Sequence, residues 1–146
     1  MKKEIEKKAE EIYMNLQYIE HNLKSLQKQA QIIENQFAEL SVAGSSLGEI
    51  KNVKEGSEIL VSVGPGIFAK AEIKDVKELI VNVGAGVAVN KSIESSKKVI
   101  DTQIDEMGEL RKKISEEMEK MIDKASMLQN ELQKIIAEAE KNPQST

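Results

Sequence analysis

The feature that most constrains this chain is a unit written twice near its centre. The first copy is EILVSVGPGIFAKAEI, from Glu58 to Ile73, and the second, 20 residues later, is ELIVNVGAGVAVNKSI, from Glu78 to Ile93. Six of the sixteen aligned positions are identical, which indicates one structural unit used twice. Each copy has a β-branched run, a Gly-x-Gly turn and a second run, the pattern of a β-hairpin. The sequence therefore predicts two tandem hairpins over residues 58–92.

The two hairpins are expected to need partners. In the first strand Ile59, Val61 and Val63 fall on one face, because side chains alternate along a strand. Apolar residues also fall on the other face, where Leu60 and its counterpart Ile80 would be exposed. Isolated two-stranded hairpins are marginally stable in water. We therefore expect other subunits to complete the sheet.

A heptad pattern fills the chain before the hairpins. Its 4-3 spacing runs without a break over five heptads, which predicts a left-handed coiled coil rather than an ordinary amphipathic helix, whose apolar face is wider. Gly44, Ser45, Ser46 and Gly48 are stop and loop signals, so we expect the helix to span residues 1–43 and a connection to span 44–57. The apolar stripe comprises Ile5, Ala9, Ile12, Leu16, Ile19, Leu23, Leu26, Ala30, Ile33, Phe37 and Leu40.

A second heptad pattern follows the hairpins and predicts a helix over residues 93–141, capped by Ser92. Arg111 interrupts its stripe, and Gly108 weakens the same turn. Arg111 could specify the register or pair with an acidic neighbour, but the favoured interpretation is that it extends its charge toward solvent at a frayed seam. Asn142-Pro143 ends the helix, and residues 142–146 are expected to be disordered. The stripe comprises Ile100, Ile104, Met107, Arg111, Ile114, Met118, Met121, Ala125, Leu128, Leu132, Ile135 and Ala139.

Two long helices that flank a compact insert pair most simply with each other, folded back antiparallel. The expected fold class is α+β, a long antiparallel coiled coil with two β-hairpins inserted between its helices. Matching the stripes allows two registers, one with Ile12 opposite Leu132 and one with Ile12 opposite Ala125. The heptads do not choose between them.

Composition excludes several classes of function. The net charge is −4, so there is no electrostatic footprint for binding nucleic acid. The chain has no Cys and no apolar run long enough to span a membrane, and its first residues do not resemble a secretory signal, so a cytoplasmic location is expected. The lone histidine, His21, has no second ligand at helical spacing, and the Gly-x-Gly turns do not extend into a nucleotide-binding motif. We expect no enzyme activity, no cofactor and no metal.

A coiled coil, two valine-rich hairpins that each carry Val-Gly-x-Gly, and a returning coiled coil together resemble the α-class subunit of prefoldin, a molecular chaperone. The resemblance covers essentially the whole chain and is specific in the hairpins, because the β class has a single hairpin. It implies a hexamer of two α-class and four β-class subunits whose hairpins form an intersubunit β-barrel. On this basis the oligomerisation residues are Leu60, Val61, Val63, Gly64, Gly66, Phe68, Ile80, Val81, Val83, Gly84, Gly86 and Val87.

The resemblance further implies that the coiled-coil ends capture unfolded proteins without ATP and pass them to a group II chaperonin. Apolar residues off the stripe support this, because they gather near both termini, as an interaction surface would. The alternative is a structural prefoldin-like scaffold that forms homo-oligomers or filaments through the same hairpins. The predicted client-binding residues are Ile5, Ala9, Ile12, Tyr13, Met14, Tyr18, Met127, Leu128, Leu132, Ile135, Ile136 and Ala139.

Overall fold

The computed structural model describes residues 2–141 of this chain, so the tail predicted at 142–146 lies outside the described residues. The elements follow one another as helix α1 (Lys2–Ile50), strands β1 (Glu58–Gly64), β2 (Ile67–Glu72), β3 (Glu78–Gly84) and β4 (Val87–Ser92), and helix α2 (Ile93–Lys141). The fold class is the predicted one, two long helices with two antiparallel hairpins between them. No helix within residues 2–141 is long and apolar enough to cross a membrane.

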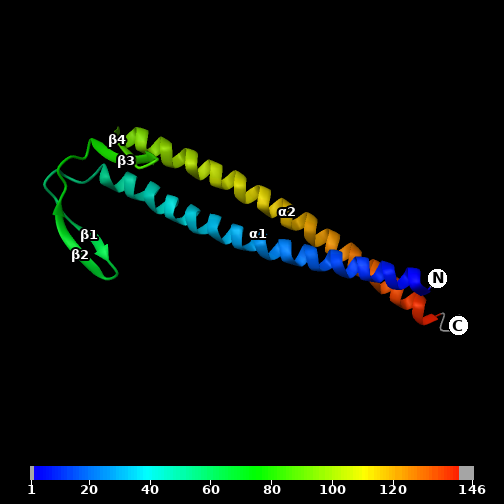
Figure 1. Ribbon diagram of the computed structural model, residues 1–146. Helices are drawn as coiled ribbons and strands as arrows, with labels where there is room; N and C mark the ends of the chain where they lie inside the picture. Colours follow the sequence, from blue (N-terminus) through cyan, green and yellow to red (C-terminus); the bar gives the residue numbers. More distant parts are fainter. Residues whose placement is uncertain (1, 142–146) are drawn as a thin grey trace. The chain divides into compact units, whose positions relative to one another are not determined.

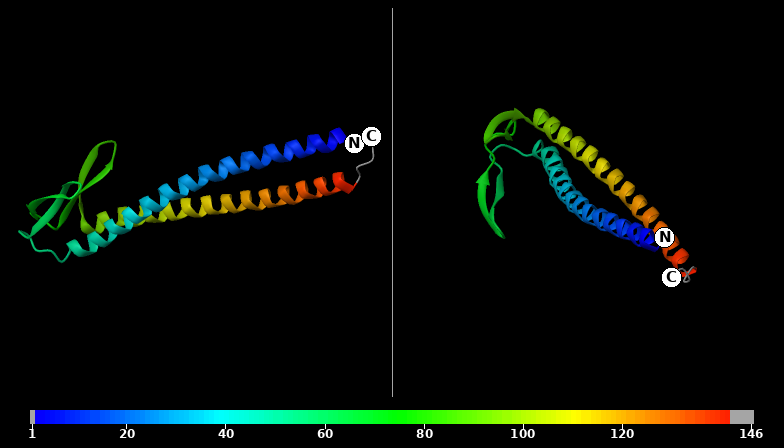
Figure 2. Two further views of the ribbon diagram at one scale, coloured as in Figure 1. Left: turned by 90° about the horizontal axis from the view of Figure 1, so that it is seen from below. Right: turned by 45° about the vertical axis from the view of Figure 1, so that its right-hand side comes forward.

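The chain divides into two compact units, and both long helices contribute to each of them. The first unit, which we call the arm, comprises Met1–Glu34 and Glu109–Thr146, and the second, the base, comprises Asn35–Gly108. In the arm, the first part of α1 and the last part of α2 lie side by side and run in opposite directions (Figures 1 and 2). The start of α1 and the end of α2 therefore lie at one end of the arm, which we call the tip.

The core of the arm is the predicted apolar stripe. It is narrow, because only the residues that face the partner helix lose contact with water. Outside the stripe, almost every side chain of the arm is exposed. The most buried apolar residues are Ile12, Ile19, Leu26, Ile33, Ile114 and Leu132.

An ion pair selects one of the two possible registers in the arm. The Nε atom of Arg111 lies 2.7 Å from Oε1 of Glu34. Glu34 follows Ile12 by 22 residues and Arg111 precedes Leu132 by 21, so the contact places Ile12 level with Leu132. With Ala125 opposite Ile12, the two charged residues would be about 12 Å apart along the axis. Arg111 thus pairs with an acidic neighbour, whereas the sequence favoured the interpretation that it only extends its charge toward solvent.

The base gives the same register and corrects the predicted end of the first helix. α1 does not end before Gly44 but continues through it to Ile50. A Cβ atom placed on Gly44 would lie 3.7 Å from Cγ2 of Ile100, so the two helices pack closely there. Gly44 occupies the next position of the heptad stripe, and its small size admits the branched side chain opposite. The packing of α2 therefore outweighs the weak helix propensity of this segment.

The hairpins form two separate two-stranded sheets with matching irregularities. Ser62 pairs with Phe68 and Gly64 with Ile67, which leaves Val63 as an extra residue. In the second hairpin Asn82 pairs with Ala88 and Gly84 with Val87, so Val83 is the extra residue there. A bulge of this kind interrupts the alternation of side chains. The alternation of side chains that was expected to include Val63 therefore ends before that residue, and the second hairpin has the same interruption at Val83.

The base also contains the junction between the second hairpin and α2. The Ser95 N–H donates to Ser92 Oγ at 3.1 Å, which confirms Ser92 as the helix cap. The Ser96 hydroxyl donates to the Ser92 carbonyl at 2.9 Å and is itself buried. A cavity of about 380 Å³ lies beside this junction, lined by the end of α1, strand β3 and the start of α2. The second hairpin is thus held against the helices of the base.

Candidate functional site

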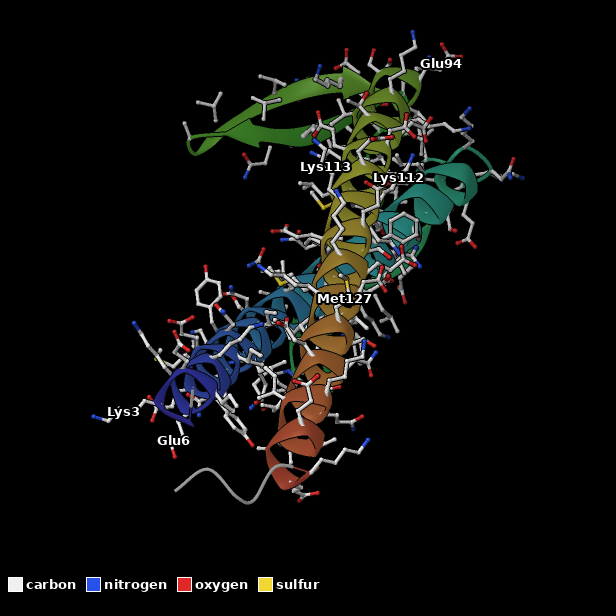
Figure 3. The ribbon with its side chains drawn as sticks, turned by 90° about the vertical axis from the view of Figure 1, so that its right-hand side faces the viewer. Lys3, Glu6, Glu94, Lys112, Lys113 and Met127 are labelled. Atoms are coloured by element: carbon white, nitrogen blue, oxygen red, sulfur yellow. The ribbon has the colours of Figure 1, made fainter. Side chains whose placement is uncertain are left out.

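The tip carries the exposed apolar side chains that the sequence predicted. Tyr13, Tyr18 and Met127 have exposed fractions of 54%, 68% and 72%, and Met14 and Ile136 are also exposed. Met127 lies on the outer surface of α2 in Figure 3. Exposed tyrosine, methionine and isoleucine side chains within a few helical turns of one another offer an apolar surface to a partner.

The other residues predicted at the tip form the seam between the helices. Ile12 and Leu132 retain only 4% and 8% of their surface, and both pack against the partner helix rather than facing solvent. Ile5, Ala9, Leu128 and Ile135 are half-buried, while Ala139, in the last turn of α2, is exposed. The predicted set therefore mixes two kinds of residue. Most of the stripe residues are buried or half-buried between the helices, whereas the off-stripe residues are accessible to a partner.

The seam has two distinct edges. On one edge, Lys8 and Glu131 form an ion pair across the two helices, with Nζ 2.9 Å from Oε1. The Glu131 carboxylate raises the pKa of Lys8 above its usual value, by accepting its hydrogen bond and through its charge. Each of these residues directly precedes a stripe residue, Ala9 or Leu132, which identifies this side as the charged edge.

The accessible residues of the tip are distributed over both sides of the seam. Tyr13 and Ile136 directly follow the stripe residues Ile12 and Ile135, so they flank the seam on the edge opposite Lys8 and Glu131. Tyr18 and Met127 each lie two positions after a stripe residue, on the outside of the charged edge. Sequence reasoning placed these residues in one cluster, whereas their heptad positions in the antiparallel pair assign them to opposite sides of the arm.

The predicted oligomerisation residues are mostly exposed. Leu60, Phe68 and Ile80 keep most of their surface accessible in the isolated chain. Val81 and Gly64 are half-buried, Val81 because β3 lies beside the helices of the base. The outer edge of each strand also has no neighbour within the described residues, since each sheet contains only two strands. The predicted residues that remain exposed are Leu60, Val61, Val63, Gly66, Phe68, Ile80, Val83, Gly84, Gly86 and Val87.

Sequence reasoning missed several exposed apolar residues away from the tip. Ile32, Leu110 and Ile122 belong to the arm, and Val42 belongs to the base. All four lie off the heptad stripe, and that position is the signal that could have identified them. The exposed apolar residues of the arm are thus not confined to the tip but continue along its length.

The described residues hold no group of three or more His, Cys, Asp or Glu side chains that could bind a metal ion. A further cavity of the base, of about 490 Å³, is an open groove along the start of α2, lined by Lys91, Lys98 and Glu106 among others. Binding through exposed surfaces is the chemistry that this arrangement supports.

Comparison with known proteins shows which family has this architecture. A family model described as "Prefoldin subunit" matches residues 19–138. Among solved structures, the chain is similar to a chain of filamentous PFD from Methanocaldococcus jannaschii, determined by cryo-EM, with a TM-score of 0.72 and 19% sequence identity. The match covers 81% of this chain and 98% of that one, and at this identity it shows a common fold.

Proposed function

Because this chain belongs to the prefoldin family, a family of chaperones and scaffolds rather than enzymes, we propose that it is an α-class subunit that holds unfolded proteins without ATP. The observation that carries the proposal is the exposed apolar surface at the tip, formed by Tyr13, Tyr18, Met127 and their neighbours. Such a surface has no role in the coiled coil itself, whose seam is already filled by the stripe.

The proposed assembly places the hairpins at the centre. Two hairpins in one chain favour the α class, because subunits of the β class have a single hairpin. Pairing with hairpins of β-class subunits would cover Leu60, Phe68 and Ile80 and remove the open strand edges. The proposed complex is a hexamer of two α-class and four β-class subunits, which works in the cytoplasm and passes its clients to a group II chaperonin.

Client capture by several tips follows from multivalency. Each apolar patch is small and binds weakly, but patches joined in one complex act at a high effective concentration on the same client. The proposed complex therefore binds an unfolded chain that offers several apolar segments, and it releases a compact native protein that offers none.

The test is light scattering from a chemically unfolded client diluted into this protein with a β-class partner, without ATP. We expect aggregation to be suppressed at near-stoichiometric amounts. Removal of residues 1–14 and 131–146 should abolish this protection, while gel filtration shows the assembly unchanged. Full protection by the truncated protein would refute a role of the tips, and loss of assembly would show that the tips hold the complex together.

A second candidate function is a structural scaffold that polymerises through its hairpins. The solved structure that this chain resembles is described as filamentous, and both sheets here have open edges. A filament needs no β-class partner, whereas the proposed hexamer does. Sedimentation of the chain alone as large, polydisperse species, with no suppression of client aggregation, would favour the scaffold.

A further inference from the structure

The sulfur atoms of this chain belong to methionine alone, because the sequence contains six Met and no Cys. Five of the six lie within the described residues. Met14 and Met127 are exposed, with exposed fractions of 63% and 72%. Met107, Met118 and Met121 belong to the stripe of α2 and are half-buried. Within residues 2–141, the exposed thioethers are therefore both in the apolar surface of the tip.

The two exposed methionines lie close to one aromatic side chain. On α1, Tyr18 is one helical turn after Met14, so the two side chains share a face of the helix. Ile12 is level with Leu132. Six residues farther into the arm on both helices, Tyr18 is level with the neighbour of Met127, so the two differ by only about 1.5 Å along the axis. Both also lie on the side of the seam that holds the charged edge, and we call Met14, Tyr18 and Met127 the methionine face.

Both thioethers of the methionine face are open to attack by a peroxide. The sulfur lone pair attacks one oxygen of hydrogen peroxide, and an S–O bond forms while the O–O bond breaks. The proton on the transferred oxygen passes to the departing hydroxide, which leaves as water. Sulfur is oxidised by two electrons and the peroxide is reduced. A cysteine thiolate that would react first is absent from the sequence, and the partner helix partly shields the stripe methionines.

Oxidation changes how the methionine face can interact with a client. A thioether is apolar and flexible, which suits contacts with varied apolar segments. The oxygen of a sulfoxide is polar and hydrated, and covering it without a new hydrogen bond costs free energy. Met14 and Met127 are two of the five off-stripe apolar residues that make the surface of the tip. Their oxidation therefore removes a large part of that surface while the stripe that holds the helices together stays intact.

We propose that Met14 and Met127 form a reversible oxidation site, at which a peroxide stops the tip from binding its client. The proposal rests on the proposed function and adds a control to it. Methionine sulfoxide reductases restore the thioether, with one enzyme for each epimer of the sulfoxide. Client binding at this tip then depends on the balance between peroxide and reductase.

Peptide mapping by mass spectrometry tests the site itself. The full chain is treated with hydrogen peroxide, catalase stops the reaction, and the sulfoxide fraction is measured at each methionine over time. We expect Met14 and Met127 to be oxidised about fivefold faster than Met118 and Met121, because exposure governs access of the peroxide. Helix content by circular dichroism should not change. Equal rates at the exposed and the half-buried methionines would overturn the proposal.

Photocrosslinking measures the effect on client binding at this tip alone. A benzophenone amino acid replaces Tyr18, and the peroxide-treated chain is assembled with an untreated β-class partner. The client is reduced, carboxymethylated α-lactalbumin, which stays unfolded. We expect oxidation to lower the yield of client crosslinks about threefold, since the client must cover polar sulfoxides, and both reductases together to restore it. An unchanged yield after complete oxidation of Met14 and Met127 would overturn the proposal.

Matched variants assign the effect to these two sulfur atoms. Each variant is compared with its own untreated sample, so its starting yield does not enter the result. Peroxide should not change the yield in Met14→Leu with Met127→Leu, whereas in Met118→Leu, which loses a sulfur of the seam, the yield should fall as in the wild type. A fall in the double variant would overturn the proposal. If the untreated wild type neither crosslinks to nor protects the client, the proposed function fails as well, whereas selective oxidation with unchanged crosslinks refutes only this proposal.

Discussion

At the scale of single residues, the glycines of this chain have two opposite roles. Gly66 has a φ angle of +71° at the turn of the first hairpin, a conformation that residues with a Cβ atom rarely adopt. Gly108 instead lies within helix α2, where a Cβ atom would meet nothing within 4 Å. In the helix, glycine only adds freedom to the unfolded chain, and any other residue would lose less entropy on folding.

Gly108→Ala is therefore expected to stabilise the fold. The free energy of unfolding should rise by up to about 1 kcal/mol, the usual difference between alanine and glycine within a helix. Thermal melting followed by circular dichroism at 222 nm measures the change, on the full chain at a fixed concentration because assembly also affects the midpoint.

The matched control is Gly66→Ala, which makes the same chemical change where φ is positive. We expect this variant to be destabilised by roughly 1 kcal/mol or more, since alanine is strained there. A decrease in stability for Gly108→Ala would instead show that α2 needs a flexible or closely approached backbone at that position.

At the scale of elements, the heptads and the hairpins were predicted from the sequence almost completely, and the end of α1 was not. Heptad and two-residue periods are local patterns, so they predict helices and strands well. The end of α1 depends on Ile100, more than 50 residues away, whose side chain packs where Gly44 has none. A glycine that ends a helix and a glycine that admits a neighbouring helix look the same in the sequence.

The apolar residues of the candidate site were predicted from the sequence, but their arrangement around the arm was not. Tyr13, Tyr18 and Met127 were identified as off-stripe residues, and all are exposed. Their division between two edges follows from their positions in the heptad once the helices run antiparallel, and the sequence analysis grouped them without using it. The Lys8–Glu131 contact shows which edge bridges the helices with charge, and the Arg111–Glu34 contact selects the register.

The register itself can be tested with engineered cysteines, since the chain has no native Cys. Ile12→Cys with Leu132→Cys should form a disulfide on mild oxidation, because a disulfide needs Cα atoms no more than about 7 Å apart. Ile12→Cys with Ala125→Cys should not, because one heptad separates that pair by about 10 Å along the axis. Non-reducing gel mobility reads out both variants.

Arg111→Leu extends this experiment to the role of the ion pair. The change completes the apolar stripe and removes the contact with Glu34. Polar residues within a seam can specify register at some cost in stability. We expect the double variant Ile12→Cys with Ala125→Cys to form its disulfide in this background, and the absence of that disulfide would show that packing alone determines the register.

At the scale of the whole molecule, the exposed hairpins determine how the chain behaves in solution. We expect the exposed side chains of Leu60, Phe68 and Ile80 to drive association of the chain at high concentration. Analytical ultracentrifugation with a β-class partner at a ratio of one to two should give a single species of six chains. The same broad distribution with and without the partner would contradict the proposed hexamer.

Because the four strands form two independent sheets, the chain has two places at which it can join another subunit. If each hairpin makes one junction, this chain is a bifunctional monomer, and a subunit with one hairpin is a chain stopper. Step growth of bifunctional units gives long polymers or closed rings, and the average length falls as the fraction of stopper rises. A discrete complex and a filament would then be two ends of one series, set by the ratio in which a cell supplies the two kinds of subunit.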